Sequence, residues 1–343
     1  MPLITDRREV LDTYRRAAEL GIALPNFCAE DRETLEAILA SALELGQEIG
    51  VDDLPIVPAW TSRYPGRSQM KLLSACEDPV IGTRLMLSDL QVLCSEDSPY
   101  GRLRVMPHLD HAWPWLDGDV MERFADHFAS IMCDASEKPL EENIRLTSDY
   151  VRRLGDRVVI EGAVDEVYSA DGAEERNEPT TVEQARRFVT ETGADLIVPN
   201  VGTEHRSTGR EVVYQRQRAR ELRDAVGSVL CIHGTSSLQA ADLAGLPEDG
   251  FVKINIFTTL AVHGGQAVAR QVLADLGSLL HPDEVAELVA RGVLGPAAVP
   301  AEARLGPKLA AVATSARRDP WFGAVKARCR DFLCALGYRK FGG

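Results

Sequence analysis

The stretch Val229-Leu-Cys-Ile-His233-Gly-Thr-Ser-Ser237 joins a short apolar run to a histidine and a small polar turn. An apolar run without polar alternation is typical of a parallel β-strand that is covered on both faces. The histidine and the turn come where such a strand ends and the next helix begins. The stretch therefore predicts a buried strand with polar residues at its C-terminal end, and the same pattern recurs along the chain.

Seven further runs share this pattern and alternate with helical segments. The eight predicted strands are Ala23–Cys28, Leu54–Ala59, Arg104–Leu109, Ser130–Ala135, Arg157–Gly162, Asp195–Val201, Val229–His233 and Phe251–Ile256. Between strands, residues 31–45 carry apolar side chains at helical spacing, and Thr181 with Gln184 forms a capping box for a helix that ends at Gly193. Eight strand–helix units predict an α/β fold, a (β/α)8 TIM barrel. The count of eight disfavours the alternative, a doubly wound open sheet.

Two regions exceed the simplest barrel. Residues 61–100 form an insertion after the second strand, and further helical patterns follow the eighth unit. The helices predicted in these regions are Val80–Cys94, Pro282–Arg291 and Phe322–Leu336. We therefore expect a single domain over residues 1–343, with a barrel core at about 21–278 and a C-terminal helical extension at about 279–343.

Composition and charge exclude several classes of protein. The 343 residues are 45% hydrophobic, which is ample for a buried core, and the net charge is −14. Such an acidic chain is a poor candidate for binding nucleic acid or an anionic membrane surface, and an anionic substrate would need local positive charge. No apolar run approaches the length of a membrane span, and the N-terminus does not resemble a signal peptide. The seven cysteines show no CxxC spacing, so we expect reduced thiols in a cytoplasmic protein.

Three histidines fall at or just after the ends of predicted strands: His111, His205 and His233. The active site of a (β/α)8 barrel lies at the C-terminal ends of its strands. Three imidazoles that converge on one point form a zinc site of the open, catalytic kind. The sequence therefore predicts one catalytic divalent metal ion, Zn²⁺, held by these histidines, with room for a monovalent cation beside it.

Asp110 is the predicted general acid/base. A carboxylate next to a metal ligand is stabilised by the cation and can exchange a proton with a substrate oxygen. The alternative role for Asp110 is to orient a histidine. His108, Asp134 and Glu161 are expected to lie behind the metal ligands. Period-two alternation places His108 on the same side of its strand as Asp110 and opposite to His111.

Polar residues at the other strand ends predict the substrate contacts. The turn at residues 234–237 offers backbone N–H groups and hydroxyls to an anion, although an ordinary helix N-cap explains its serines equally well. The predicted substrate-binding residues are Asn26, Gly202, Arg206, Gly234, Thr235, Ser236, Asn255 and Thr258. Within this set, Arg206 could supply positive charge to an anionic substrate.

Together these motifs resemble the class II, metal-dependent fructose- and tagatose-bisphosphate aldolases. The motifs that carry the resemblance are His108-Leu-Asp-His111, Asp134-Ala-Ser136 with Pro139-Leu-Glu-Glu-Asn143, Gly202-Thr-Glu-His205, His233-Gly-Thr-Ser236 and Asn255-Ile-Phe-Thr258. The resemblance implies a lyase that makes and breaks a C–C bond through a metal-stabilised enediolate, with Asn255 at the bound ketose. It also implies a second acid/base on the loop after the fifth strand, where Glu174 and Glu175 are the candidates.

The chain departs from the family pattern around the sugar pocket. Arg206, Thr235 and Ser237 stand where the family has glycines, and Phe257 stands where it has an aspartate. Glycine allows a backbone to approach phosphate closely, so these changes reshape the pocket. We therefore expect an anionic ketose or aldehyde as substrate, a ketose phosphate or a related anion other than fructose 1,6-bisphosphate.

Two other functions compete with this prediction. A zinc hydrolase on a barrel would carry a His-x-His pair after the first strand, where this chain has Asn26-Phe-Cys28. A non-catalytic, metal-binding subunit that stabilises a partner would fit the altered pocket, but the retained Asp110 argues against it. The long C-terminal helical region favours a homodimer or homotetramer.

Overall fold

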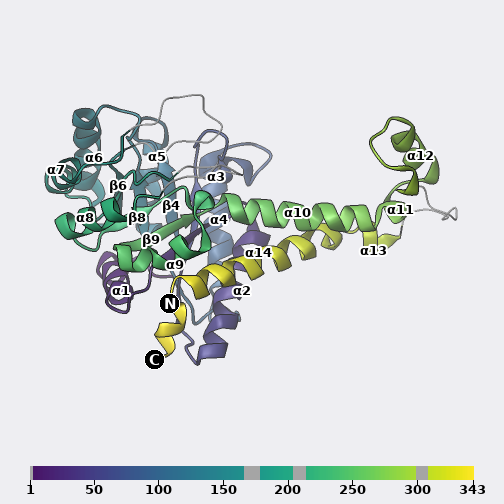
Figure 1. Cartoon of the computed structure of the whole chain (residues 1–343), viewed down its shortest axis with the longest axis horizontal. Helices are drawn as coiled ribbons and strands as arrows, with labels where there is room; N and C mark the ends of the chain where they lie inside the picture. The colour runs from purple at the N-terminus through teal and green to yellow at the C-terminus, as the bar shows by residue number, and fades with distance from the viewer. Residues whose placement is uncertain (1–2, 166–177, 204–213, 299–307) are drawn as a thin grey trace.

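The computed structural model describes residues 3–165, 178–203, 214–298 and 308–343. Eight parallel strands close into a barrel in the order β1, β2, β4, β5, β6, β7, β8, β9 and back to β1. Their bounds are β1 Leu24–Cys28, β2 Pro55–Thr61, β4 His108–Ala112, β5 Ser130–Cys133, β6 Val159–Ala163, β7 Leu196–Val198, β8 Leu230–Ile232 and β9 Phe251–Ile256. The predicted TIM barrel is therefore confirmed (Figure 1).

The third predicted strand, residues 104–109, is divided in two. β3 (Arg104–Val105) pairs with the beginning of β2, and β4 starts at His108. Pro107 lies between the two strands, and proline has no N–H group to donate to the ladder. β4 then continues to Ala112, so the strand carries the whole histidine-containing motif to the rim of the barrel.

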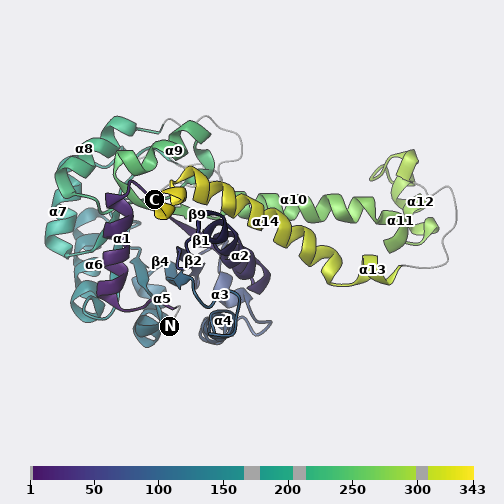
Figure 2. The ribbon, with the colours of Figure 1, turned by 90° about the horizontal axis from the view of Figure 1, so that it is seen from below.

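Helices cover the outside of the barrel. The helices that follow its strands are α2 Arg32–Ile49, α5 Pro114–Phe124, α6 Leu140–Leu154, α7 Val182–Thr192, α8 Arg216–Val226 and α9 Ala240–Asp249. The predicted capping box is present, because Thr181 and Gln184 each accept a backbone N–H of the other, and Gly193 ends α7 in the left-handed conformation. α1 (Arg7–Glu19) lies against the barrel (Figure 2), where it contacts β6 and β9 and buries Tyr14.

A long helical arm projects from the barrel (Figures 1 and 2). It consists of α10 (Thr258–Ala274), which follows β9, and α14 (Ser315–Ala335), which returns to pack on α2 and β1. Its far end holds α11 Leu276–Leu279, α12 Pro282–Ala290 and α13 Leu309–Val312. The insertion after β2 holds α3 Gln69–Leu72 and α4 Pro79–Leu93. Short 3-10 turns are η1 Ala125–His127, η2 Thr235–Ser237, η3 Pro296–Ala298 and η4 Tyr338–Gly342.

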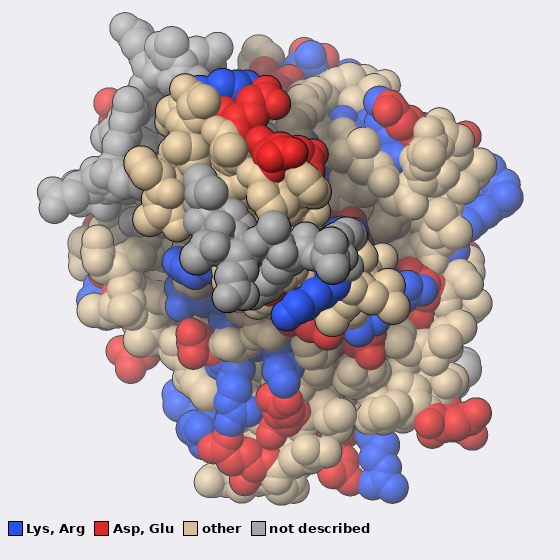
Figure 3. All heavy atoms as spheres, turned by 90° about the vertical axis from the view of Figure 1, so that its right-hand side faces the viewer, with Lys and Arg blue, Asp and Glu red and all other residues tan. Residues whose placement is uncertain are grey.

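Acidic and basic side chains are interspersed over the face seen along the arm (Figure 3). Ion pairs also join the arm to the barrel. Lys326 on α14 pairs with Glu44 on α2 at 2.5 Å, and Arg330 pairs with Glu48 one turn further along both helices. Among the residues that the structure describes, no helix is both long enough and apolar enough to cross a membrane.

Gly264 marks a close approach between the two helices of the arm. A Cβ atom at this position would lie 2.6 Å from the ring of Trp321. That ring is held in place, because its Nε1–H donates to the hydroxyl of Thr34 at 2.9 Å. Gly264→Ala should therefore lower the free energy of unfolding by about 1–3 kcal/mol through overpacking, as measured by chemical denaturation.

The next residue, Gly265, provides a matched control. A Cβ atom there would meet nothing within 4 Å. Gly265→Ala should raise the free energy of unfolding by about 0.5–1 kcal/mol, because alanine loses less conformational entropy than glycine in a helix. Equal effects of the two substitutions would contradict the close packing at Gly264.

Candidate active site

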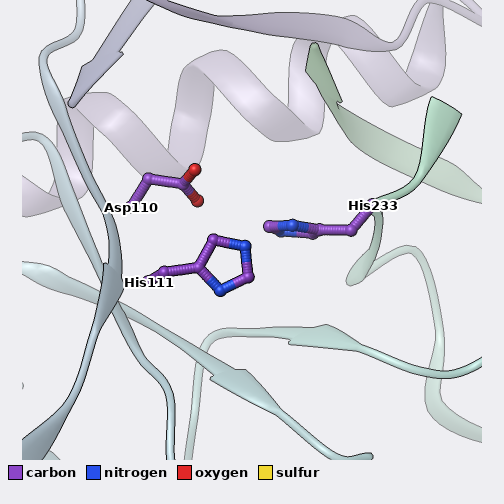
Figure 4. Close-up of side chains that lie close together, drawn as sticks. All are labelled: Asp110, His111 and His233. Carbon is purple, nitrogen blue, oxygen red and sulfur yellow. The ribbon is translucent and has the colours of Figure 1, made fainter. Parts of the chain in front are cut away.

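Asp110 and His111 at the end of β4 face His233, which directly follows β8 (Figure 4). All three residues are buried, and one donor atom from each lies within 4.8 Å of the others. The rings of His111 and His233 have centroids 4.7 Å apart and planes 77° apart. The structure thus brings two of the predicted metal ligands together with the predicted acid/base at the C-terminal rim of the barrel.

The backbone at His111 explains how two consecutive residues face the same space. Neighbouring side chains on a regular strand point to opposite faces, as the sequence pattern predicted for this motif. His111 instead has φ 44°, which is uncommon for a residue other than glycine, and the β4–β5 register shifts between Leu109 and Ala112. Backbone strain of this kind concentrates at functional sites, and here it turns His111 toward the same point as Asp110.

Asp134, just beyond β5, fixes the orientation of His111. Its Oδ2 lies 2.6 Å from Nδ1 of His111, and its Oδ1 accepts from the hydroxyl of Ser136 at 2.6 Å. Burial raises the pKa of Asp134, but the bonds to His111 and Ser136 outweigh burial and bring the pKa below its usual value. An ionised carboxylate only accepts, so Nδ1 of His111 carries a proton, and Nε2 is the nitrogen that a metal would use. The ring of Tyr64 stacks on the ring of His111, with the two centroids 4.4 Å apart.

His233 is held in its neutral form. Burial lowers its pKa to about 4, and the nearby Glu161 opposes this shift without reversing it. Nε2 of His233 lies 3.6 Å from Oε1 of Glu161 and contacts the side-chain amide of Asn255. Neutral imidazole is the form that binds a metal, so His233 is ready for this role near neutral pH.

Asp110 is fully buried, and both of its carboxylate oxygens have partners. Oδ1 accepts from the amide of Asn255 at 3.0 Å, and Oδ2 accepts from the guanidinium of Arg67 at 2.6 Å. Burial raises the pKa of Asp110, but His111 and Arg67 outweigh burial and hold the pKa well below its usual value. Asp110 is therefore an oriented, ionised carboxylate that can accept a proton from a bound hydroxyl.

Sequence reasoning missed Arg67. This residue lies in the insertion after β2, and its Cζ atom is 4.8 Å from the ring centroid of Phe257 and 5.6 Å from that of Tyr64. The available signal was weak: residues 63–67 read Arg-Tyr-Pro-Gly-Arg, a basic loop shortly after a predicted strand end. Nothing in this local pattern indicates that the second arginine reaches Asp110.

Sequence reasoning also missed Lys253, a fully buried lysine on β9. Its ammonium donates to Oε2 of Glu161 at 2.6 Å and lies 2.9 Å from Nε2 of His108, whose Nδ1 contacts Ser130 at 2.7 Å. Burial raises the pKa of Glu161, but Lys253 and His233 outweigh burial and hold the pKa far below its usual value. A lysine inside the run of residues 251–256, whose other members are apolar except Asn255, was the signal. His108 and Glu161 therefore belong to one buried, charge-balanced cluster beside His233.

A cavity of about 230 Å³ opens beside His233. Five of the predicted substrate-binding residues line it: Gly234, Thr235, Ser236, Asn255 and Thr258. The remaining wall includes Tyr64, Arg67, Trp113 and Phe257. Asn26, in the middle of β1, is buried and lacks partners for both amide atoms, and the buried atoms Oγ of Ser236 and Oδ1 of Asn255 also lack partners. Buried polar atoms are almost always hydrogen-bonded, so these atoms are candidates for contact with a ligand.

The remaining predicted site residues belong to two segments of the sequence. His205, Arg206, Glu174 and Glu175 lie outside the described residues. The last described residues before His205 and Arg206 are Gly202, which has φ +86°, and Thr203, which is buried. Gly202 is not among the described residues that line the cavity.

The residues that the structure describes fit a divalent metal ion. Two imidazoles and a neighbouring carboxylate are donors that zinc and similar metals accept. Asp134 orients His111 through its Nδ1, and burial favours the neutral form of His233, which is the form that binds a metal. The centre is therefore a candidate metal site on the catalytic rim of a (β/α)8 barrel.

Comparisons with known proteins identify the family. The family model described as class II fructose-bisphosphate aldolase matches residues 8–298, and the chain belongs to this family. It is accordingly a lyase of the aldolase type.

Two crystal structures share its fold. Fructose-bisphosphate aldolase (Fba) from Campylobacter jejuni matches with a TM-score of 0.72 and 18% identity, covering 97% of this chain and 95% of that one. The YdjI aldolase from Escherichia coli K12 matches with a TM-score of 0.62 and 22% identity, covering 96% of both chains.

Proposed function

We propose that this protein is a zinc-dependent aldolase that reversibly cleaves a C–C bond in a ketose phosphate or related anionic ketose other than fructose 1,6-bisphosphate. The convergence of Asp110, His111 and His233 is the observation that carries the proposal. His111 and His233, with His205 from outside the described residues, are the proposed ligands. When bound, zinc would polarise the ketone of the substrate.

In this proposal Asp110 acts as the general acid/base. In cleavage its carboxylate takes the proton from the hydroxyl beside the bond that breaks. That oxygen becomes the aldehyde carbonyl, and the electron pair of the broken bond stays with the ketone half. In condensation the proton returns to the new hydroxyl. The contacts from Asn255 and Arg67 support this role because they orient the carboxylate, and each of its oxygens keeps a further lone pair that can accept the substrate proton. Glu174 or Glu175 would protonate the carbon of the ketone half.

The walls of the cavity support a substrate different from fructose 1,6-bisphosphate. Phe257 presents an aromatic ring where a carboxylate would face sugar hydroxyls, and Trp113 adds a second aromatic wall. The hydroxyl of Thr235 donates to the backbone oxygen of Asn255 at 2.7 Å, which fixes this side chain beside Gly234. Asn26, Gly202, Arg206, Ser236 and Thr258 complete the proposed contacts to the substrate.

A cytoplasmic homodimer or homotetramer is part of the same proposal. Large apolar side chains are exposed on the arm, including Leu273 at 61%, Val293 at 61% and Leu309 at 81%. Such side chains on a projecting element support self-association.

The proposal is tested by a cleavage assay on a panel of ketose phosphates and acidic ketoses, with and without a chelator. We expect an aldehyde product from at least one member, loss of this activity with chelator, and recovery when Zn²⁺ is added back. A protein that binds zinc stoichiometrically but turns over no member of the panel would favour the non-catalytic, metal-binding subunit instead.

A further inference from the structure

Arg67 is the one cation among the described residues that line the cavity. Its side chain is 8% exposed, and its guanidinium lies over the rings of Tyr64 and Phe257. A cation with so little access to water is costly unless anions face it. The family pattern has a carboxylate at the position of Phe257, so this chain has replaced an anion with an aromatic ring that favours a cation beside it.

The guanidinium of Arg67 retains capacity for a second anion. Nη2 donates to Asp110, and Nη1 donates to the sulfur of Cys28 at 3.5 Å. Burial raises the pKa of the Cys28 thiol, which therefore contributes no negative charge. Nε of Arg67 is buried without a hydrogen-bond partner. A guanidinium has five N–H groups in a planar fork, so a planar anion could bind here beside the contact with Asp110.

The contact between Arg67 and Asp110 also limits where that anion sits on the substrate. Asp110 exchanges a proton with the hydroxyl on the carbon that becomes the aldehyde. A group held by Arg67, whose Nη2 is 2.6 Å from the same carboxylate, would lie near that hydroxyl, which favours attachment within one or two bonds of that carbon. A terminal group three carbons away would extend past this position.

The charge balance favours a carboxylate over a phosphate. Asp110 faces Arg67, Glu137 adds another acidic side chain to the cavity lining, and no other described residue of the lining is a lysine or arginine. A carboxylate adds a single charge and matches the planar fork, whereas a phosphate would bring up to two charges into the same half-enclosed space.

We propose that Arg67 selects substrates whose aldehyde half carries a carboxylate next to the carbonyl, so that the acceptor in condensation is a short oxo acid such as glyoxylate. In that direction the electron pair of the donor carbon forms the new C–C bond. The aldehyde oxygen takes a proton that Asp110 has first acquired from solvent, Asp110 returns to its ionised form, and the carboxylate of the acceptor remains unchanged as the group that is recognised. This inference rests on the proposed function, because it assigns the substrate class of the same site.

The first experiment compares acceptors on zinc-loaded, full-length protein with dihydroxyacetone phosphate as donor. Glyoxylate and glycolaldehyde are both two-carbon aldehydes that differ in the carboxylate, and glyceraldehyde 3-phosphate carries a distant phosphate. We expect kcat/KM for glyoxylate to exceed that for glycolaldehyde by about 30-fold or more, the range of a charge-assisted hydrogen bond. A ratio near one, or a preference for glyceraldehyde 3-phosphate, overturns the inference.

Variants then test whether Arg67 causes the preference. Arg67→Gln should lower the glyoxylate/glycolaldehyde ratio to near one, and Arg67→Lys, which keeps the charge but not the fork, should give an intermediate ratio. The ratio is informative because any disturbance of Asp110 affects both acceptors alike. Arg63→Gln is the matched control: Arg63 lies in the same loop, pairs with Asp119 at 2.7 Å and should leave the ratio unchanged. A structural role for Arg67 would lower both rates and preserve the ratio, which would overturn the inference.

Two further measurements separate failure of this inference from failure of the proposed function. Deuterium exchange from solvent into dihydroxyacetone phosphate reports the ketone half-reaction without any acceptor. Exchange without a glyoxylate preference overturns the role of Arg67 and leaves the aldolase function intact. Calorimetric binding of glyoxylate tests whether Arg67 recognises the carboxylate even if no deuterium exchange is observed. We expect glyoxylate to bind the wild type at least about tenfold more tightly than Arg67→Gln. Equal binding to the two proteins overturns the inference.

Discussion

Asp110→Asn should lower kcat for aldol cleavage by about 10²–10⁴-fold, the range expected for loss of a general acid/base. The amide keeps the shape of the side chain but cannot take a proton from the substrate hydroxyl. His111 and His233 remain in place, so zinc content should change little. Turnover measured with the best substrate of the ketose panel, together with zinc content by mass spectrometry, checks both parts of this expectation.

The buried pairing of Asp110 with Arg67 requires a stability control. The variant leaves the guanidinium without its carboxylate, so thermal unfolding must show that the protein is still folded at the assay temperature. Asp126→Asn serves as the matched control, because this carboxylate pairs with Arg157 on the surface and should leave turnover unchanged. A folded Asp110→Asn protein with activity within a fewfold of wild type would show that the acid/base assignment is wrong.

The second large effect concerns the metal. His111→Ala and His233→Ala should each weaken zinc binding by more than about 100-fold and reduce turnover to background, since each removes a proposed ligand. Asp134→Asn should weaken zinc binding by a smaller factor, about 10–100-fold, because it only loosens the orientation of His111. Competition with a chromophoric chelator measures these affinities.

The order of these effects tests the geometry of the centre. A larger loss of zinc affinity in Asp134→Asn than in His111→Ala would contradict the assignment of His111 as the ligand and Asp134 as the residue that orients it. His263→Ala is the matched control, because this exposed histidine on α10 contacts Thr259 within its own helix and should leave zinc binding unchanged. Full zinc occupancy in both His111→Ala and His233→Ala would exclude the centre as the metal site.

Much of the barrel could be predicted because strand and helix signals are local. Continuous apolar runs, the capping box at Thr181 and the terminal Gly193 each depend on residues a few positions apart. The break at Pro107 was readable in principle, since proline cannot donate to a strand ladder, but the prediction drew one strand through it. The arm is a different case: helical patterns predicted α12 and the later part of α14, but not that α10 and α14 leave the barrel together.

The sequence by itself determined the eight strand–helix units and the polar residues at the strand ends, because backbone hydrogen bonding and side-chain periodicity act over short distances along the chain. Only the tertiary structure decided which of those residues meet. The left-handed backbone of His111 turns it toward the side that Asp110 faces. Arg67 reaches Asp110 across 43 positions of sequence, and Lys253 reaches His108 across 145. Such contacts depend on closure of the barrel, which brings distant strand ends to one rim, and no local pattern records them.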